Sequence, residues 1–217
     1  MDRMSATAET RTDRTRRSII AAATTLFLGN GFGATSMDDV AATADVSKQT
    51  VYAHFGSKEA LFLDVVDRLT GGAGDALQHK VADPVDDRPI EDFLLDFANQ
   101  QLAIVMTPRL MQLRRLVIGE RDRFPDLGRK LHERGPGRSI GRLATAFARY
   151  DRLGQIRVAD PRAAAGFFNW LVMGAPTNDA MLLGDAAIPS PQALRDHARE
   201  SVRIFLAAYA MEMQSES

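Results

Sequence analysis

The sequence predicts an all-α protein, and three observations support this fold class. Apolar residues recur at intervals of three and four along most of the 217 residues, which is the spacing of one face of an α-helix. The pairs Thr107-Pro108, Asp160-Pro161 and Ser190-Pro191 mark helix starts, because each first residue is a good N-cap and proline is tolerated at the first helical position. No segment shows the alternation and tight turn of a β-hairpin.

The predicted helices follow one another closely. Their apolar stripes run from Ile19 to Phe27, Leu61 to Leu69, Ile90 to Phe97, Leu110 to Val117, Ile140 to Phe147 and Leu194 to Tyr209. Glycine and proline clusters separate them at residues 29–31, 71–74, 83–84, 124–125, 135–137 and 188–189. We expect a connecting helix that begins near Ser57 and ends at the glycines of 71–74. The predicted order is a disordered tail over 1–10, a small three-helix domain over 11–56, a larger helical domain over 57–213 and a disordered tail over 214–217.

The composition excludes several classes of protein. The chain is 45% hydrophobic and 25% charged, with 27 Lys and Arg against 28 Asp and Glu, which is ordinary for a folded globular protein. It contains no cysteine, so disulfide scaffolds, thiolate nucleophiles and Cys-ligated metals are excluded. No apolar run approaches the roughly 18 residues of a membrane span, and the N-terminus lacks the apolar centre of a signal peptide. We therefore expect a cytoplasmic protein without a membrane partner.

The near-neutral total charge hides blocks of opposite sign. Residues 83–108 carry one basic and six acidic side chains, whereas residues 109–142 carry ten basic and four acidic ones. We interpret such blocks first as solvated helix faces that keep the protein soluble. The formal net charge of −1 also argues, taken alone, against nucleic-acid binding, which usually shows a basic excess.

The residues that most enzymes need are absent or scattered. The four histidines, His54, His79, His132 and His197, have no metal-ligand partner at close helical spacing. No glycine-rich phosphate loop follows a strand, and no serine lies in a nucleophile elbow. We expect no catalytic activity, no metal and no cofactor.

Residues 36–55 predict two short helices joined by a tight turn. Ser36 can cap the first helix with Asp39 as its capping-box partner, and Ser47 can cap the second. Ala44-Asp45-Val46 forms the turn, with Val46 closing the junction. This is the layout of a helix-turn-helix, whose second helix enters the major groove of DNA.

The outer face of the second helix suits that role. At about 100° per residue, Val51 and Phe55 face inward whereas Gln49 and Ala53 face outward, and the outer face carries no acid. Glutamine can read an adenine edge, and helix N-termini bind phosphates. The predicted contacts with double-stranded operator DNA are Thr35, Ser36, Ser47, Lys48, Gln49, Thr50, Tyr52, His54 and Lys58, of which Gln49, Thr50 and Tyr52 read bases.

These motifs resemble those of a known family. Residues 14–63 resemble the N-terminal domain of TetR-type transcriptional regulators, through Ile19-Ile20-Ala21-Ala22-Ala23, the run from Val46 to Phe55, and Ser57-Lys58-Glu59-Ala60-Leu61. Residues 107–153 are similar to the effector domain of AefR-like members, through Thr107-Pro108-Arg109, Phe124-Pro125-Asp126-Leu127 and Gly135-Pro136. The resemblance implies a homodimeric repressor that releases its operator when a small molecule binds the C-terminal domain.

The larger domain has the composition of a small-molecule sensor. Aromatic, methionine and amide side chains concentrate in residues 90–106 and 161–183, and a ligand site requires an apolar cavity with a few polar groups. The alternative for each aromatic residue is a place in the core. The predicted contacts with a hydrophobic effector are Phe93, Phe97, Gln101, Met106, Leu113, Phe147, Trp170, Met173 and Asn178.

The last two helices, near residues 161–182 and 191–212, carry small residues that permit close approach of another helix. We expect them to form a four-helix dimer interface. The sequence thus predicts a ligand-responsive, dimeric repressor of a palindromic operator. Two other functions stay open: a constitutive DNA-binding regulator or activator whose C-terminal domain only dimerises, and a helical adaptor that binds only proteins.

Overall fold

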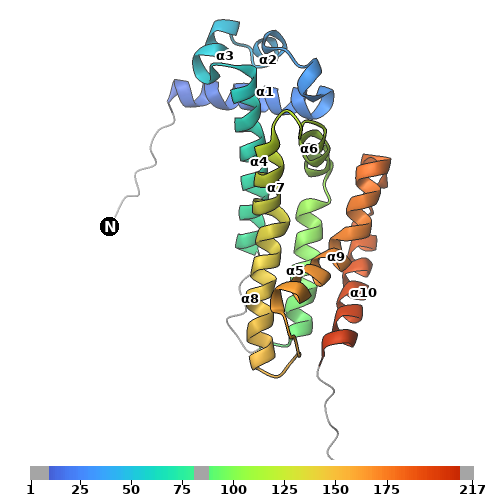
Figure 1. Ribbon diagram of the computed structural model, residues 1–217. Helices are drawn as coiled ribbons and strands as arrows, with labels where there is room; N and C mark the ends of the chain where they lie inside the picture. Colours follow the sequence, from blue (N-terminus) through green and yellow to red (C-terminus); the bar gives the residue numbers. More distant parts are fainter. Residues whose placement is uncertain (1–9, 81–87, 211–217) are drawn as a thin grey trace, which may run out of the picture. The chain divides into compact units, whose positions relative to one another are not determined.

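Helices make up the part of the chain that the computed structural model describes, residues 10–80 and 88–210 (Figure 1). No strand occurs in these residues, so the prediction of an all-α protein is confirmed. The predicted tails over 1–10 and 214–217 lie outside the described residues, except for Thr10, which is the N-cap of the first helix.

The chain divides into two compact units, residues 1–68 and 69–217. The first contains α1 (Arg11–Ala34), α2 (Met37–Thr43), α3 (Lys48–Phe55) and the first turns of α4 (Lys58–Lys80). Phe27, Phe32 and Phe62 meet in its core, with ring centroids 4.9 to 5.9 Å apart. A boundary after residue 56 would separate Phe62 from the other two rings, because Phe62 lies on α4.

A capping box and one glycine shape α1. The Thr10 hydroxyl accepts a hydrogen bond from the Asp13 amide at 3.1 Å, and the Asp13 carboxylate accepts one from the Thr10 amide at 3.2 Å. Near the other end, Gly31 has φ 82° and ψ 169°, a conformation that residues with a Cβ rarely adopt. The glycine cluster at 29–31 therefore produces a kink inside α1.

The second unit continues α4 and adds a set of helices packed on one another. They are α5 (Ile90–Val105), α6 (Pro108–Gly119), α7 (Pro125–His132), the π-helical turn η1 (Glu133–Gly137), α8 (Arg138–Arg152), α9 (Pro161–Leu183), the 3₁₀ turn η2 (Asp185–Ala187) and α10 (Pro191–Tyr209). The three predicted N-caps are confirmed, because Thr107, Asp160 and Ser190 accept backbone N–H bonds at the starts of α6, α9 and α10. α9 packs against α8 and α10, and α10 packs along α5.

The core of this unit is rich in aromatic rings. Phe205 of α10 stacks on Phe147 of α8, with ring centroids 4.9 Å apart, and meets Phe168 of α9 edge-on at 5.1 Å. Tyr209 stacks on Phe205 at 4.6 Å. Such pairs contribute about 0.5–1.5 kcal/mol beyond their buried area, so these rings hold three helices in fixed positions.

A proline inside α9 is compensated from α10. Pro176 has no amide hydrogen and cannot bond the carbonyl of Val172, four residues earlier. The Nε2 atom of His197 lies 2.9 Å from that carbonyl oxygen and donates the missing hydrogen bond. His197 therefore joins α10 to the middle of α9.

An ion pair holds the C-terminal end of α9. Arg115 of α6 pairs with Asp185, and it also donates to the carbonyl of Ala180 at 2.8 Å. Gln112 donates to the same carboxylate at 2.6 Å. The Arg115 guanidinium holds the pKa of Asp185 below its ordinary value, so this carboxylate is charged at neutral pH.

One predicted helix boundary is wrong. α4 continues through Gly71, Gly72 and Gly74 to Lys80 instead of ending at these glycines. Glycine in a helix interior costs only about 1 kcal/mol relative to alanine, which packing of the rest of the helix can offset. The break predicted at 135–137 is a kink, because η1 leads from α7 into α8 and Gly135 has φ −99° and ψ −106°.

Gly56 should matter for the stability of the first unit. It ends α3 with φ 74°, in the left-handed region, where a residue with a Cβ loses about 1–2 kcal/mol. Gly56→Ala should lower the free energy of unfolding by that amount, as measured by urea denaturation followed by circular dichroism.

Gly33→Ala is the matched control for this measurement. Gly33 is helical and lies outside the left-handed region, and no atom lies within 4 Å of the position that its Cβ would take. Its replacement should leave stability unchanged or raise it by about 0.4–1 kcal/mol. Equal stabilities of the two variants would contradict the expectation for Gly56.

Candidate DNA interface and ligand cavity

The turn between α2 and α3 is closed by a backbone bond and buried apolar residues. Asp45 has φ 54°, a conformation that Asp adopts more readily than most residues with a Cβ. The Val46 amide donates to the Ala41 carbonyl at 3.0 Å, and Ala44 and Val51 are buried. α2 and α3 therefore cross closely, as a helix-turn-helix requires.

The outer face of α3 is open. Gln49 and Ala53 are exposed, and 43% of the surface of Tyr52 is exposed. Thr50 is half-buried, and its hydroxyl oxygen lies 2.7 Å from that of Ser47. Because α3 carries no acidic residue, nothing on this helix repels a phosphate or an electronegative base edge.

Three helices of the unit begin with a serine cap. The hydroxyls of Ser36, Ser47 and Ser57 each accept a bond from the amide three residues later, at 3.0 to 3.1 Å. At Ser36 the capping box is complete, and the bonds from Ser36 lower the pKa of Asp39 below its ordinary value. First-turn amides have no partner within the helix and can bind phosphate oxygens.

Thr35 is placed differently from the other predicted phosphate ligands. Only 2% of its surface is exposed, and its hydroxyl donates to the Gly31 carbonyl at 2.9 Å. The side chain therefore supports the kink in α1, and only the backbone of this residue could meet DNA.

Both predicted lysine contacts already have partners in the free protein. Lys48 Nζ lies 2.9 Å from Asp38 Oδ2, and this bond raises the pKa of Lys48. Lys58 Nζ lies 4.4 Å from the centre of the Phe32 ring and 3.4 Å from the Gly33 carbonyl oxygen. Lys48 must therefore exchange a carboxylate for a phosphate when it binds DNA, a competition that the sequence did not reveal.

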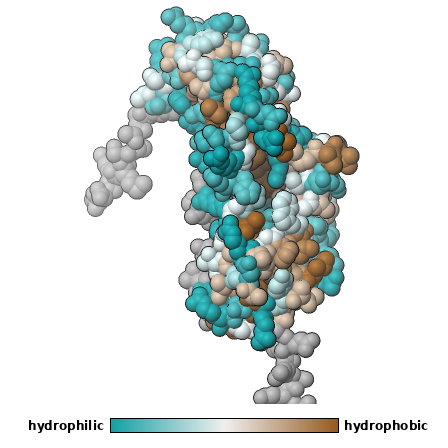
Figure 2. Space-filling model, in the orientation of Figure 1, coloured by the Kyte–Doolittle hydropathy of each residue, from teal (hydrophilic) through white to brown (hydrophobic). Residues whose placement is uncertain are grey.

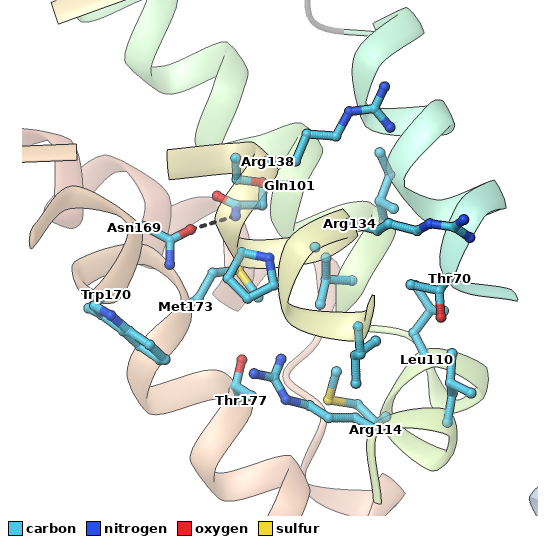
Figure 3. A pocket seen from close by; sticks show the side chains of 18 of the residues that line it. Thr70, Gln101, Leu110, Arg114, Arg134, Arg138, Asn169, Trp170, Met173 and Thr177 are labelled. Atoms are coloured by element: carbon cyan, nitrogen blue, oxygen red, sulfur yellow. Dashed lines mark hydrogen bonds between the residues drawn. The ribbon is translucent and has the colours of Figure 1, made fainter. Parts of the chain in front are cut away.

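A cavity lies among the helices of the second unit (Figure 3). The space between its lining atoms amounts to about 940 Å³, with the mouth included. Its wall is mainly apolar and includes Ile104 and Val105 of α5, Leu110, Met111 and Leu113 of α6, and Met173 of α9. A mostly apolar cavity with a few polar groups is the usual form of a small-molecule site.

An amide pair forms one polar part of the wall. Gln101 of α5 donates from Nε2 to Oδ1 of Asn169 of α9 at 2.9 Å, and both side chains are almost fully buried. The other amide atom of Gln101, Oε1, is buried and has no hydrogen-bond partner in the described part of the chain. An unsatisfied buried acceptor costs about 1–3 kcal/mol, so this atom suits a ligand.

The structure gathers some of the predicted ligand contacts at this cavity and places the others elsewhere. Those that line it are Gln101, Leu113, Trp170 and Met173. Those that lie in the packed core are Phe93, Phe97, Met106 and Phe147. These four are core residues because their helices turn them toward the aromatic cluster.

Asn178 is exposed, whereas Asn169 lines the cavity. Asn169, Met173 and Thr177 follow one another at intervals of four residues and share a face of α9. Asn178 lies five residues after Met173, about 140° around the helix. The fourfold spacing is the sequence signal that favours Asn169.

Four arginines of the cavity wall were not among the predicted contacts. They are Arg114 of α6, Arg134 of η1, and Arg138 and Arg142 of α8. All four belong to the basic block of residues 109–142, which we interpreted as a solvated surface. The spacing of four between Arg134, Arg138 and Arg142 is the signal that could have placed them on one helix face.

Two family patterns together match most of the chain. Residues 92–211 match the C-terminal domain of AefR-like transcriptional repressors, and residues 19–65 match the N-terminal pattern of bacterial regulatory proteins of the tetR family. The chain belongs to the TetR family. Its members are transcriptional regulators with a DNA-binding N-terminal domain and a dimeric, ligand-binding C-terminal domain, so the prediction that the chain is not an enzyme is confirmed.

Individual TetR-family proteins match over different lengths. A structure described as a TetR-family transcriptional regulator from Mesorhizobium loti MAFF303099 is 37% identical, with a TM-score of 0.83 over 94% of this chain and 100% of that one. The flavonoid-responsive regulator FrrA is 33% identical, with a TM-score of 0.69 over 92% of this chain and 98% of that one. The transcriptional activator FasR of Mycolicibacterium smegmatis is 40% identical over 70 residues, which span 30% of this chain and about a third (32%) of FasR.

None of the helices in residues 10–80 and 88–210 has both the length and the apolar content of a membrane span. Over the same ranges, no three His, Asp or Glu side chains are grouped so as to hold a metal ion.

Gln49→Ala should reduce the discrimination between bases at one position of the operator. The exposed amide is the group on α3 best able to read a base edge, and a good bidentate contact is worth about 1–3 kcal/mol. The measurement is a set of binding isotherms on operators with single base changes. Gln192→Ala, an exposed amide on α10, is the control, and an unchanged base preference of Gln49→Ala would refute the assigned reading face.

Lys48→Ala should weaken binding to all DNA sequences alike. Loss of one phosphate contact lowers the slope of log affinity against log salt by about 1. Lys58→Ala should behave in the same way, and Asp38→Asn should strengthen binding because it removes the carboxylate that competes for Lys48. A salt titration by fluorescence anisotropy measures these slopes, and a sequence-dependent loss would contradict a phosphate role.

Proposed function

We propose that this TetR-family protein is a ligand-responsive repressor. It binds a palindromic operator as a homodimer and releases it when a small hydrophobic, aromatic effector enters the cavity of the second unit. Gln49, Thr50 and Tyr52 read bases, whereas the cap of Ser36, the N-terminus of α3 at Ser47, and Lys48, His54 and Lys58 contact phosphates. The description of the C-terminal match as a repressor domain favours repression over activation.

The observation that carries this proposal concerns α4. This helix follows the helix-turn-helix directly in sequence and runs from Lys58 to Lys80, and its residue Thr70 lines the cavity. A ligand in the cavity therefore contacts the same helix that begins where the DNA-reading segment ends. An effector that prefers one position of α4 shifts the protein toward the state that has this position.

The size of the required preference follows from linkage. A tenfold loss of operator affinity on effector binding needs an effector that binds the DNA-free state tenfold more tightly, or about 1.4 kcal/mol. A few altered contacts in the cavity wall can supply this difference. No change of fold in either unit is needed.

The wall of the cavity supports an aromatic effector. Met173 and Met111 adapt to the shape of a ligand, and Trp170 offers a ring face or edge for stacking. FrrA, 33% identical over most of both chains, is described as flavonoid-responsive. We extend to this chain only the general class, a compound with aromatic rings.

The apolar surface of α9 and α10 supports a homodimer. α9 exposes large apolar side chains, namely Phe167, Trp170, Leu182 and Leu183, between 56% and 74% of whose surface is accessible. Figure 2 shows hydrophobic surface over α9. α10 adds Ile204 and the small residues Ala207 and Ala208. Two copies that pair these helices would form a four-helix interface and present two reading helices to half-sites about 34 Å apart.

The release of DNA tests the proposed function. The protein should bind the DNA that flanks its own gene at nanomolar to submicromolar concentration, and aromatic compounds from a mixed library of acids and neutral molecules should weaken this binding at least tenfold. Anisotropy of labelled DNA is the measurement. If no compound in the library changes it, the protein is a constitutive regulator, whose C-terminal domain only dimerises.

Phe167→Arg should convert the dimer into a monomer and abolish cooperative operator binding. The substitution places a charge in the centre of the proposed interface, where it would lose hydration without a partner. Sedimentation velocity measures the change of mass. Leu153→Arg is the control, because Leu153 is also an exposed apolar residue (45% accessible) but ends α8; a dimeric Phe167→Arg variant would place the interface elsewhere.

A further inference from the structure

The side chain of Arg114 enters the cavity, and no counter-ion for it is found among the described residues. In Figure 3 its guanidinium points toward Thr177 across the space between α6 and α9. The side chain is half-buried, and no hydrogen bond or ion pair joins it to any residue in the described part of the chain. Its sequence neighbour Arg115, in contrast, is paired with Asp185.

An unpaired cation in an apolar wall is unfavourable. Burial lowers the pKa of Arg114, yet a guanidinium stays protonated at neutral pH. Its positive charge is therefore partly removed from water with nothing to replace the hydration. An anion within hydrogen-bond distance would compensate for the lost hydration, because it would form short, charge-assisted hydrogen bonds with the guanidinium.

The protein supplies no such anion from the described wall. No Asp or Glu is among the described residues that line the cavity. Arg134 and Arg138 extend away from Arg114 in Figure 3, and Arg134 Nη1 lies 3.7 Å from the position that a Cβ of Gly71 would take. Of the three arginines that Figure 3 labels, Arg114 is the one whose charged group faces the interior.

The second polar element lies at the other end of the same wall. The Gln101–Asn169 pair is eight residues before Thr177 on α9, which corresponds to about 12 Å along the helix axis. Oε1 of Gln101 is buried and has no hydrogen-bond partner among the described residues. A hydroxyl group both donates and accepts, so it satisfies this amide pair in either orientation of the two amides.

We infer that the effector is an elongated aromatic acid. Its carboxylate or phenolate binds Arg114, its rings lie against Met173 and Trp170, and a hydroxyl at its far end bonds the Gln101–Asn169 pair. This inference rests on the proposed function, since it assumes that the cavity is the effector site. A neutral effector would leave the half-buried guanidinium of Arg114 without a counter-ion among the described residues, and the charge would add nothing to the affinity of such an effector.

Three matched compounds test the ligand class by isothermal titration calorimetry with the full chain at neutral pH. The first is 4′-hydroxybiphenyl-4-carboxylate, which has the two polar groups at opposite ends of two rings. The second is its methyl ester, which lacks the charge, and the third is 4′-methoxybiphenyl-4-carboxylate, which cannot donate from the far end. The acid should bind at least tenfold more tightly than the ester and at least about fivefold more tightly than the methoxy acid.

Two arginine variants on α6 test the anchoring residue. Arg114→Met should lower the affinity for the acid at least tenfold and change the affinity for the ester by less than threefold. The preference for the acid over the ester should therefore disappear. Arg109→Met is the matched control, because Arg109 is exposed on the same helix and does not line the cavity; this variant should keep the preference. Arg114→Met should also melt at the wild-type temperature or above it, because it removes a half-buried charge that has no counter-ion among the described residues, whereas a structural role would lower the melting temperature.

The inference is overturned by any of three results. They are an ester that binds wild type as tightly as the acid, an Arg114→Met variant that retains the preference, and an acid that fails to saturate the protein at millimolar concentration. None of these results contradicts the proposed function, because a neutral compound that releases the DNA in the anisotropy assay would still support it. The proposed function is contradicted by a different result, namely that neither the acids nor the neutral compounds release the DNA.

Discussion

The second unit depends on one helix, α9, being packed on several sides at once. Phe168 lies in the aromatic core with Phe147 and Phe205, whereas the next residue, Asn169, lines the cavity and the preceding one, Phe167, is exposed. Since consecutive residues point about 100° apart, one helix contributes to the core, the cavity wall and an outer apolar face. A rotation of α9 by a single residue would exchange these environments. The position of α9 therefore decides which side chains can meet a ligand.

Several polar contacts hold α9 in that position. Asp160 caps its start, the Arg115–Asp185 pair holds the segment after its end, and His197 bonds the carbonyl that Pro176 leaves free. Each of these contacts is half-buried or exposed and contributes modestly. Together with the aromatic core, they leave α9 one register with respect to α6 and α10. This rigidity is what lets a cavity persist beside a close-packed core.

In the first unit, α2 and α3 are too short to be stable alone and depend on contacts with the rest of the unit. Isolated helices below about 12 residues are marginal in water, and these two have seven and eight residues. The hydroxyl of each serine cap accepts a hydrogen bond from the amide three residues later, and Val51 and Ala44 are buried where α2 and α3 pack together. The stability comes from the inner face and the ends, so the outer face of α3 can carry Gln49 and Tyr52 without a structural task. Because its outer face has no structural role, α3 can use this face to contact DNA.

Local interactions explain what could be predicted from the sequence. The helix starts at Thr107, Asp160 and Ser190, the turn at Asp45 and the inward direction of Val51 each depend on residues within one or two turns of chain, so they could be recognised before any fold was known. The local charge of a helix can also be predicted from the sequence, because the eight residues of α3 include no Asp or Glu. The total charge of −1 was uninformative, since it averages over units that meet different partners.

Tertiary structure decided which of several similar residues does what. By sequence, Phe93, Phe97 and Trp170 are equivalent aromatics and Arg114 and Arg115 equivalent cations. In the structure, Trp170 and Arg114 line the cavity, the two phenylalanines fill the core and Arg115 joins α6 to η2. Likewise Lys48 meets Asp38 across ten residues of chain, and α4 continues through glycines expected to end it. The physical reason is the same in each case: burial and pairing depend on how helices distant in sequence are rotated against one another, and the amphipathic pattern of a single helix does not contain that rotation.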